Sequence, residues 1–109
     1  NDVQRVRLVR TLEDGLAADT SAERGWLARI ELAQQRHPRD TGLQYLAGKA
    51  CMNRQLWGKA QQLLAQAAAG LQDPELRARA WRALAELAEQ RGDADGAAQA
   101  WKAAALVLK

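Results

Sequence analysis

A single histidine, a single cysteine and a single methionine are the side chains best suited to hold a haem or a metal ion in this sequence of 109 residues. His37 precedes Pro38, which disfavours helical backbone at position 37 and predicts the end of a helix there. Because a cation at that place complements the helix dipole, we expect a capping or solvated histidine, with haem ligation as the alternative. Cys51 and Met52 are soft ligands, but a buried cysteine commonly packs as a small apolar side chain, and we expect Cys51 in the core.

Catalysis needs a further set of cooperating groups. Glu86 and Glu89 lie three residues apart on one predicted helix, but no partner group completes an acid–base site with them. One cysteine excludes a disulfide framework and an all-cysteine zinc site, and one histidine excludes a site built on a pair of histidines. We therefore expect no enzyme activity, no cofactor and no metal.

The composition favours helices. The chain contains 24 Ala and 16 Leu but only eight Val, Ile and Thr residues together. Ala and Leu enter a helix at little cost, whereas strands are enriched in branched and aromatic residues. The length predicts one domain with a modest core. The net charge of +3 is lower than a dedicated nucleic-acid binder usually carries, so no nucleic-acid partner is expected.

Turn-forming residues divide the chain into six predicted helices, at about 3–18, 22–36, 41–54, 57–69, 74–91 and 94–107. Thr20 begins a capping box, and Asp73 followed by Pro74 is a typical N-cap with proline at the first helical position. Gly92 beside Asp93 predicts a left-handed helix stop next to a new cap. Connections this short predict that neighbouring helices pack antiparallel, as helical hairpins.

Two of the hairpins repeat at an offset of 37 residues and resemble the 34-residue unit of tetratricopeptide repeats (TPR). Small residues recur where two helices must approach closely, and large residues flank them. The expected packing positions are Gly48, Trp57, Ala60, Leu64, Ala67, Trp81, Ala85, Ala97, Trp101 and Ala104. The sequence therefore predicts an all-α, TPR-like right-handed superhelix of about three hairpins, with units of about 1–38, 39–73 and 74–109. The first unit is weaker, because Trp26 falls near a position that should be small.

A closer resemblance rests on the sequence RQLWGKA at 54–60, RLVR at 7–10, Trp26-Leu27 and RHPRD at 36–40. Together these segments resemble the C-terminal TPR region of proteobacterial HemY-type proteins, which belong to the inner membrane and support protohaem biogenesis. The resemblance implies a non-catalytic helper of late haem (porphyrin) synthesis that faces the cytoplasm and binds enzymes of that pathway. It also implies a membrane anchor outside this fragment, in line with a first residue that is Asn1 rather than Met.

The first helix of each TPR-like pair is expected to line a concave face, the usual partner surface of such arrays. Eight side chains are expected there: Tyr45, Lys49, Met52, Asn53, Arg79, Arg82, Glu86 and Glu89. Lys49 and Asn53, with the pair Arg79 and Arg82, resemble in part the carboxylate clamp with which some TPR domains hold a peptide C-terminus. The two glutamates of this set would repel an acidic peptide, so a general groove for a protein or peptide is the favoured hypothesis.

Two other functions stay open at this point. One is direct binding of haem or porphyrin, through His37 or Tyr45. The other is self-association through the open ends of the repeat array, because residues 104–108 form an apolar face and repeat stacks normally end in polar caps.

Contact with a membrane is expected only through an anchor outside the chain. The longest apolar run, Ala103–Leu108, has six residues, where about twenty are needed to span a bilayer. Arg5, Arg7 and Arg10 alternate with valines, which predicts an amphipathic helix with a basic face. That face is either solvated or in contact with anionic lipid.

Overall fold

The computed structural model describes residues 2–18 and 23–108, apart from the side chains at 2, 12, 14–18, 23–24 and 26–27. This part of the chain forms α1 (Asp2–Ala18), α2 (Glu23–Arg36), α3 (Thr41–Asn53), α4 (Trp57–Gly70), α5 (Pro74–Gln90) and α6 (Ala94–Val107). Each predicted helix boundary is met to within one residue. The predicted capping box at Thr20 and the side chain of Trp26 lie outside the described residues. None of these helices is both long enough and apolar enough to cross a bilayer.

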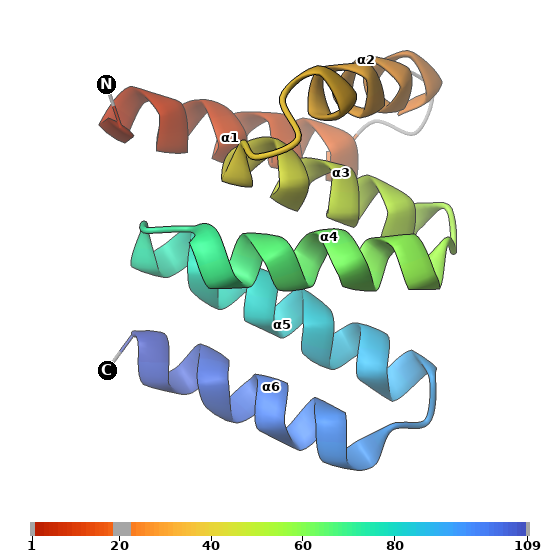
Figure 1. Cartoon of the computed structure of the whole chain (residues 1–109), viewed down its shortest axis with the longest axis vertical. Coiled ribbons are helices and arrows are strands. Elements are labelled where there is room, and N and C mark those ends of the chain that lie inside the picture. The colour runs from red at the N-terminus through yellow and green to blue at the C-terminus, as the bar shows by residue number, and fades with distance from the viewer. Residues whose placement is uncertain (1, 19–22, 109) are drawn as a thin grey trace.

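Consecutive helices alternate in direction and are stacked along the longest axis of the molecule (Figure 1). The pairs α3 with α4 and α5 with α6 form the most extensive helix contacts, and α4 packs on α5 between them. Both α1 and α2 pack on α3 at one end of the stack, while α6 forms the other end. The predicted all-α arrangement is confirmed, with α3–α4 and α5–α6 as antiparallel helical hairpins, whereas α1 and α2 pack mainly on α3.

Local signals fix where the helices begin and end. Asp40, Asp73 and Asp93 cap α3, α5 and α6, and each carboxylate accepts a hydrogen bond from the backbone amide three residues later. Pro74 occupies the first turn of α5. Gly92 has a φ of 74°, the left-handed conformation that ends α5 and that glycine adopts without steric cost. The predicted caps at Asp73 and Asp93 and the stop at Gly92 are therefore confirmed.

Small residues bring α3 and α4 close together. Gly48 lies directly against Leu64, so that a Cβ placed on Gly48 would be 2.7 Å from Leu64 Cγ. Ala60, Leu64 and Ala67 are fully shielded from solvent along this contact. The matched positions of the next hairpin, Ala85, Ala97 and Ala104, are buried as well. The small residues thus lie inside the helix pairs, where the repeat pattern places them.

The tryptophans at repeat positions differ in burial. Trp57 and Trp81 are partly buried and pack against the core, as expected. Trp101 is 40% exposed and donates a hydrogen bond from Nε1 to Glu89 Oε1 of α5 at 2.6 Å. The expectation that Trp101 is enclosed between helices is therefore wrong for the described residues, because α6 is the last helix of the described stack and no other described helix covers this side of it.

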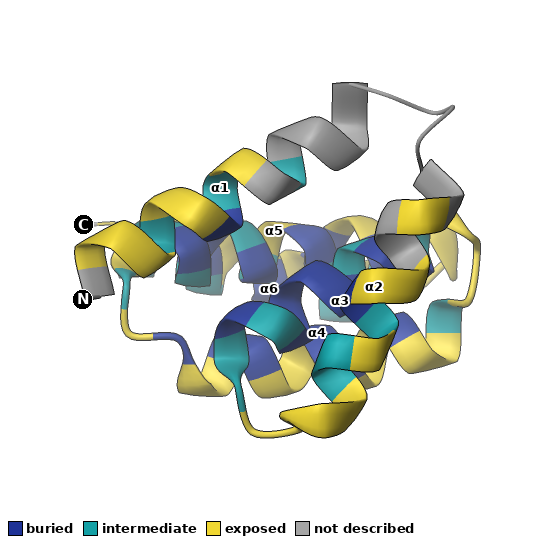
Figure 2. Cartoon of the chain, turned by 90° about the horizontal axis from the view of Figure 1, so that it is seen from above, coloured by how far each residue is buried: buried dark blue, intermediate teal, exposed yellow. Residues whose placement is uncertain are grey.

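Buried residues gather in α3, α4 and α5, whereas most of the described part of α1 is exposed (Figure 2). Among the described side chains of the first two helices, only Val9 and Ile30 are buried. α2 is also joined to the end of α3 by an ion pair between Glu31 and Arg54, with an N–O distance of 3.0 Å. Because α1 buries so little apolar surface, its attachment to the other helices depends on polar contacts.

Candidate binding cleft

A cleft of about 800 Å³ lies where the N-terminal half of α1 passes the first turns of α3 and α5. Its most deeply buried lining side chains are apolar and come from three places: Val9 of α1, Leu71 after α4 and Leu76 of α5. Gly42 of α3 lets α1 come close, because a Cβ there would be 3.1 Å from Val9 Cγ2. The cleft therefore has an apolar floor between elements that are distant in sequence.

The capping aspartates of α3 and α5 also bind α1 along this cleft. Arg5 forms an ion pair with Asp40. Arg10 reaches Asp73 at 3.3 Å and Glu75 at 2.7 Å. Two of the three arginines expected on a solvated or lipid-facing surface are thus used within the fold, where they attach α1 to the starts of two other helices.

One turn further along α1, Glu13 joins three helices. The Tyr45 hydroxyl of α3 donates to Glu13 Oε2, and Arg79 Nη1 of α5 donates to Glu13 Oε1 at 2.6 Å. Burial raises the pKa of Tyr45 above its ordinary value, and the Glu13 carboxylate raises it further. Burial lowers the pKa of Arg79, but the hydrogen bond and charge of Glu13, together with Tyr45 and Glu75, raise it by more, so that this pKa lies above its ordinary value. Tyr45 is only 1% exposed, so its side chain contacts α1 through Glu13 and is not accessible to the ligand expected to bind it.

The other predicted groove residues do not form one surface with the cleft. Lys49 and Met52 are half-buried, and Asn53, Arg82 and Glu86 are exposed. Met52 packs against the core. Glu89 bonds to Trp101 and therefore faces α6, which corrects its expected place in the groove. None of the eight predicted groove residues lines the cleft, which lies at the N-terminal ends of α3 and α5.

Two arginines of the cleft are free to bind an acidic ligand. Arg7 and Arg39 line it and are exposed, and neither guanidinium forms an ion pair within the described part of the chain. The lining contains four arginines and two aspartates, so its formal charge is +2. This site was not predicted from the sequence, because its lining comes from segments that are distant along the chain.

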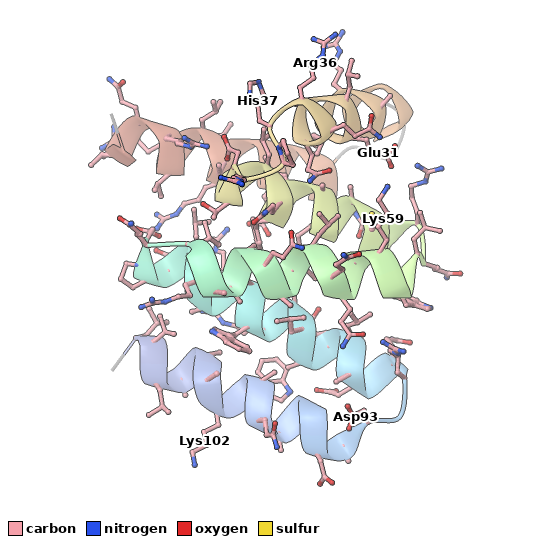
Figure 3. All side chains as sticks on the ribbon, in the orientation of Figure 1. Glu31, Arg36, His37, Lys59, Asp93 and Lys102 are labelled. Atoms are coloured by element: carbon pink, nitrogen blue, oxygen red, sulfur yellow. The ribbon has the colours of Figure 1, made fainter. Side chains whose placement is uncertain are left out.

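The candidate haem and metal ligands lie apart from the cleft. His37 is exposed just after α2 and, like Arg36, points away from the stack (Figure 3). Cys51 is buried in the core, as expected, and burial raises the pKa of its thiol. Across the described residues, no three His, Cys, Asp or Glu side chains come together as metal ligands.

Comparisons with family models, with curated proteins and with solved structures gave no match to this chain. The resemblance to HemY-type proteins therefore stays an expectation from the sequence segments that carry it. A function proposed for this chain therefore rests on the residues and shape of the cleft.

Proposed function

We propose that this chain is a non-catalytic interaction scaffold that binds a segment of another protein in the cleft between α1 and the starts of α3 and α5. The observation that carries the proposal is an open cleft of about 800 Å³ with an apolar floor and two exposed arginines, Arg7 and Arg39, at its edge. Apolar hollows with a few well-placed polar groups are the usual form of a binding site. An extended acidic peptide with an apolar side chain fits both features, because guanidinium–carboxylate bonds are charge-assisted.

The geometry favours a peptide over a porphyrin. Of the two side chains considered for haem, Tyr45 is enclosed by Glu13 and Arg79, and His37 is exposed and points away from the stack (Figure 3). Neither side chain lines the cleft.

Two matched double substitutions test the site. Arg7→Glu with Arg39→Glu reverses charge at the cleft, and Lys49→Glu with Arg82→Glu makes the same net change at two positions of α3 and α5 that do not line it. Peptides selected from a random library against the chain are then measured against both variants by fluorescence anisotropy. We expect the cleft variant to lose about tenfold or more in affinity, since a charge-assisted bond contributes about 1.5–3 kcal/mol.

Other results would contradict peptide binding in the cleft. Loss of binding only in the Lys49 and Arg82 variant would favour the groove predicted from the sequence. Peptide binding that neither variant weakens, or a selection that enriches no peptide, would remove the support for an acidic ligand at this face.

A role in late haem biosynthesis is a proposal that rests on the sequence resemblance alone. In that role, the partner would be an enzyme of the haem pathway, met at the cytoplasmic side of the inner membrane. The test is capture from a proteobacterial membrane extract by the chain and by its Arg7→Glu, Arg39→Glu variant. A haem-pathway enzyme retained by the first and lost by the second supports the role, and its absence from both eluates counts against it.

A further inference from the structure

Four charged side chains of alternating sign join α1 to α5. Arg10 Nη2 of α1 lies 2.7 Å from Glu75 Oε2 of α5, and Glu75 Oε1 lies 3.4 Å from Arg79 Nη2 one turn later. Arg79 Nη1 in turn lies 2.6 Å from Oε1 of Glu13, which is three residues after Arg10 on α1. The buried Tyr45 of α3 donates a hydrogen bond from its hydroxyl to the same glutamate. This charge cluster, formed by Arg10, Glu13, Glu75 and Arg79, therefore connects α1 to both α5 and α3.

α1 has few apolar contacts besides the charge cluster. Among its described side chains, only Val9 is buried, and Val6 is partly buried against the core. A further ion pair joins Arg5 to Asp40, but the arginine side chain of that pair is 52% exposed. Exposed ion pairs stabilise little, and elements with few buried apolar contacts open most readily. We therefore expect that α1 can separate from α3 and α5 while the rest of the stack stays folded.

Separation of α1 would remove one wall of the cleft. Arg7 lies on α1, whereas Arg39 directly precedes the cap of α3, so the two exposed arginines of the cleft face each other only while α1 is docked. Glu13 and Arg79 hold α1 in this position, yet neither of them lines the cleft. Their pair is therefore placed to affect a ligand of the cleft from outside the site.

We propose that the pair of Glu13 and Arg79 is a latch that controls peptide binding by setting the fraction of molecules in which α1 is docked. This proposal rests on the proposed function, because the controlled site is the cleft. A ligand that binds only the docked state loses apparent affinity in proportion to the fraction of that state, and its binding favours docking in return. Bound peptide should therefore slow hydrogen exchange in α1. Glu13 is a positioning residue in this scheme and does not contact the peptide.

Glu13→Gln tests the latch, with Glu31→Gln as the matched control. Glu31 forms an ion pair with Arg54 that joins α2 to α3, and it does not line the cleft, so its substitution removes the same charge without touching the latch. The ligand is a synthetic peptide that alternates glutamate with leucine. Loss of a negative charge by itself should slightly favour this acidic ligand, whereas an open latch should weaken its binding by about threefold or more. Hydrogen exchange in α1 should become faster in Glu13→Gln alone.

A disulfide that holds α1 in place separates the latch from other effects of the substitution. An ideal Cβ on Gly42 lies 3.1 Å from Val9 Cγ2, so Val9→Cys with Gly42→Cys brings two thiols within bonding reach, and the buried Cys51 is not accessible to compete. Both changed residues line the cleft, so the comparison is between the reduced and oxidised forms of one protein. Adding Glu13→Gln should weaken peptide binding in the reduced form and leave it unchanged in the oxidised form.

The outcomes distinguish the latch from the proposed function. An unaltered chain that does not bind the peptide would overturn both. Peptide binding that is equal in Glu13→Gln and Glu31→Gln would overturn the latch and leave binding in the cleft standing. A loss of affinity that persists in the oxidised form would do the same, because the tether already keeps α1 docked.

Discussion

One added methyl group at Gly48 tests the close contact of α3 with α4. An ideal Cβ there lies 2.7 Å from Leu64 Cγ, 2.9 Å from Leu64 Cδ2 and 3.3 Å from the Leu64 backbone nitrogen. Ordinary van der Waals contact begins near 3.4 Å, so the methyl group overlaps Leu64 Cγ by about 0.7 Å. Because Leu64 is 0% exposed and its backbone nitrogen cannot rotate away, α4 must shift to make room.

Two opposing effects determine the stability of Gly48→Ala. Overpacking a core costs about 1–3 kcal/mol, and replacing glycine by alanine inside a helix returns about 1 kcal/mol. Because backbone has to move at this site, we expect Gly48→Ala to lower the free energy of unfolding by about 1–2 kcal/mol. Gly58→Ala is the control: no atom lies within 4 Å of a Cβ there, so this variant should be unchanged or slightly more stable.

Urea unfolding followed by circular dichroism measures both variants. In a thermal melt, the expected loss for Gly48→Ala corresponds to roughly 4–8 °C in Tm for each kcal/mol in a small domain. A Gly48→Ala variant as stable as the unaltered chain would refute the reasoning, because it would mean that α3 and α4 do not approach this closely.

Three further predictions concern the buried network and the attachment of α1. Tyr45 is the only tyrosine, and its raised pKa means that its phenolate absorbance should not appear near the ordinary pKa of 10.0. The free energy of unfolding should fall as the pH rises above that value, and it should fall less in Tyr45→Phe. A tyrosine titration with the ordinary pKa would contradict this prediction. Cys51 is buried with a raised thiol pKa, so it should react with a disulfide reagent only on unfolding; rapid reaction in the native protein would show an open core. Arg10→Ala, or added salt, should speed hydrogen exchange in α1 about two- to fivefold, because partly exposed ion pairs contribute about 0.2–1 kcal/mol each. Exchange in α6, which takes no part in these ion pairs, should stay the same. Unchanged exchange in α1 of the variant would mean that the ion pairs do not hold α1.

The helices and their ends were predictable because their causes are local. Asp73, Pro74 and Gly92 act within a few residues of their own positions, so the sequence contains the whole cause. The burial of Gly48 and Ala85 was predictable for a related reason, since a repeat places the same contact twice. Periodicity along the chain therefore predicted both the hairpins and the small residues inside them.

The candidate site was harder to predict because it joins distant segments. Glu13 encloses Tyr45 from 32 positions away and binds Arg79 from 66 positions away. Nothing near Tyr45 in the sequence shows that α1 will cover it. Trp101 was misplaced for the opposite reason: the repeat pattern expects an enclosed position there, but at the end of the stack that position stays open.

Chemical-shift mapping by NMR is the most direct test of peptide binding in the cleft. The probe is a synthetic peptide that alternates glutamate with leucine, titrated into the isotopically labelled chain. We predict saturable shifts of the amide resonances of Arg7, Arg39, Gly42 and Gly70, all of which line the cleft, and little change along α6. Shifts confined to residues 49–69 or to α6, or shifts that persist in the Arg7→Glu, Arg39→Glu variant, would contradict the proposed function.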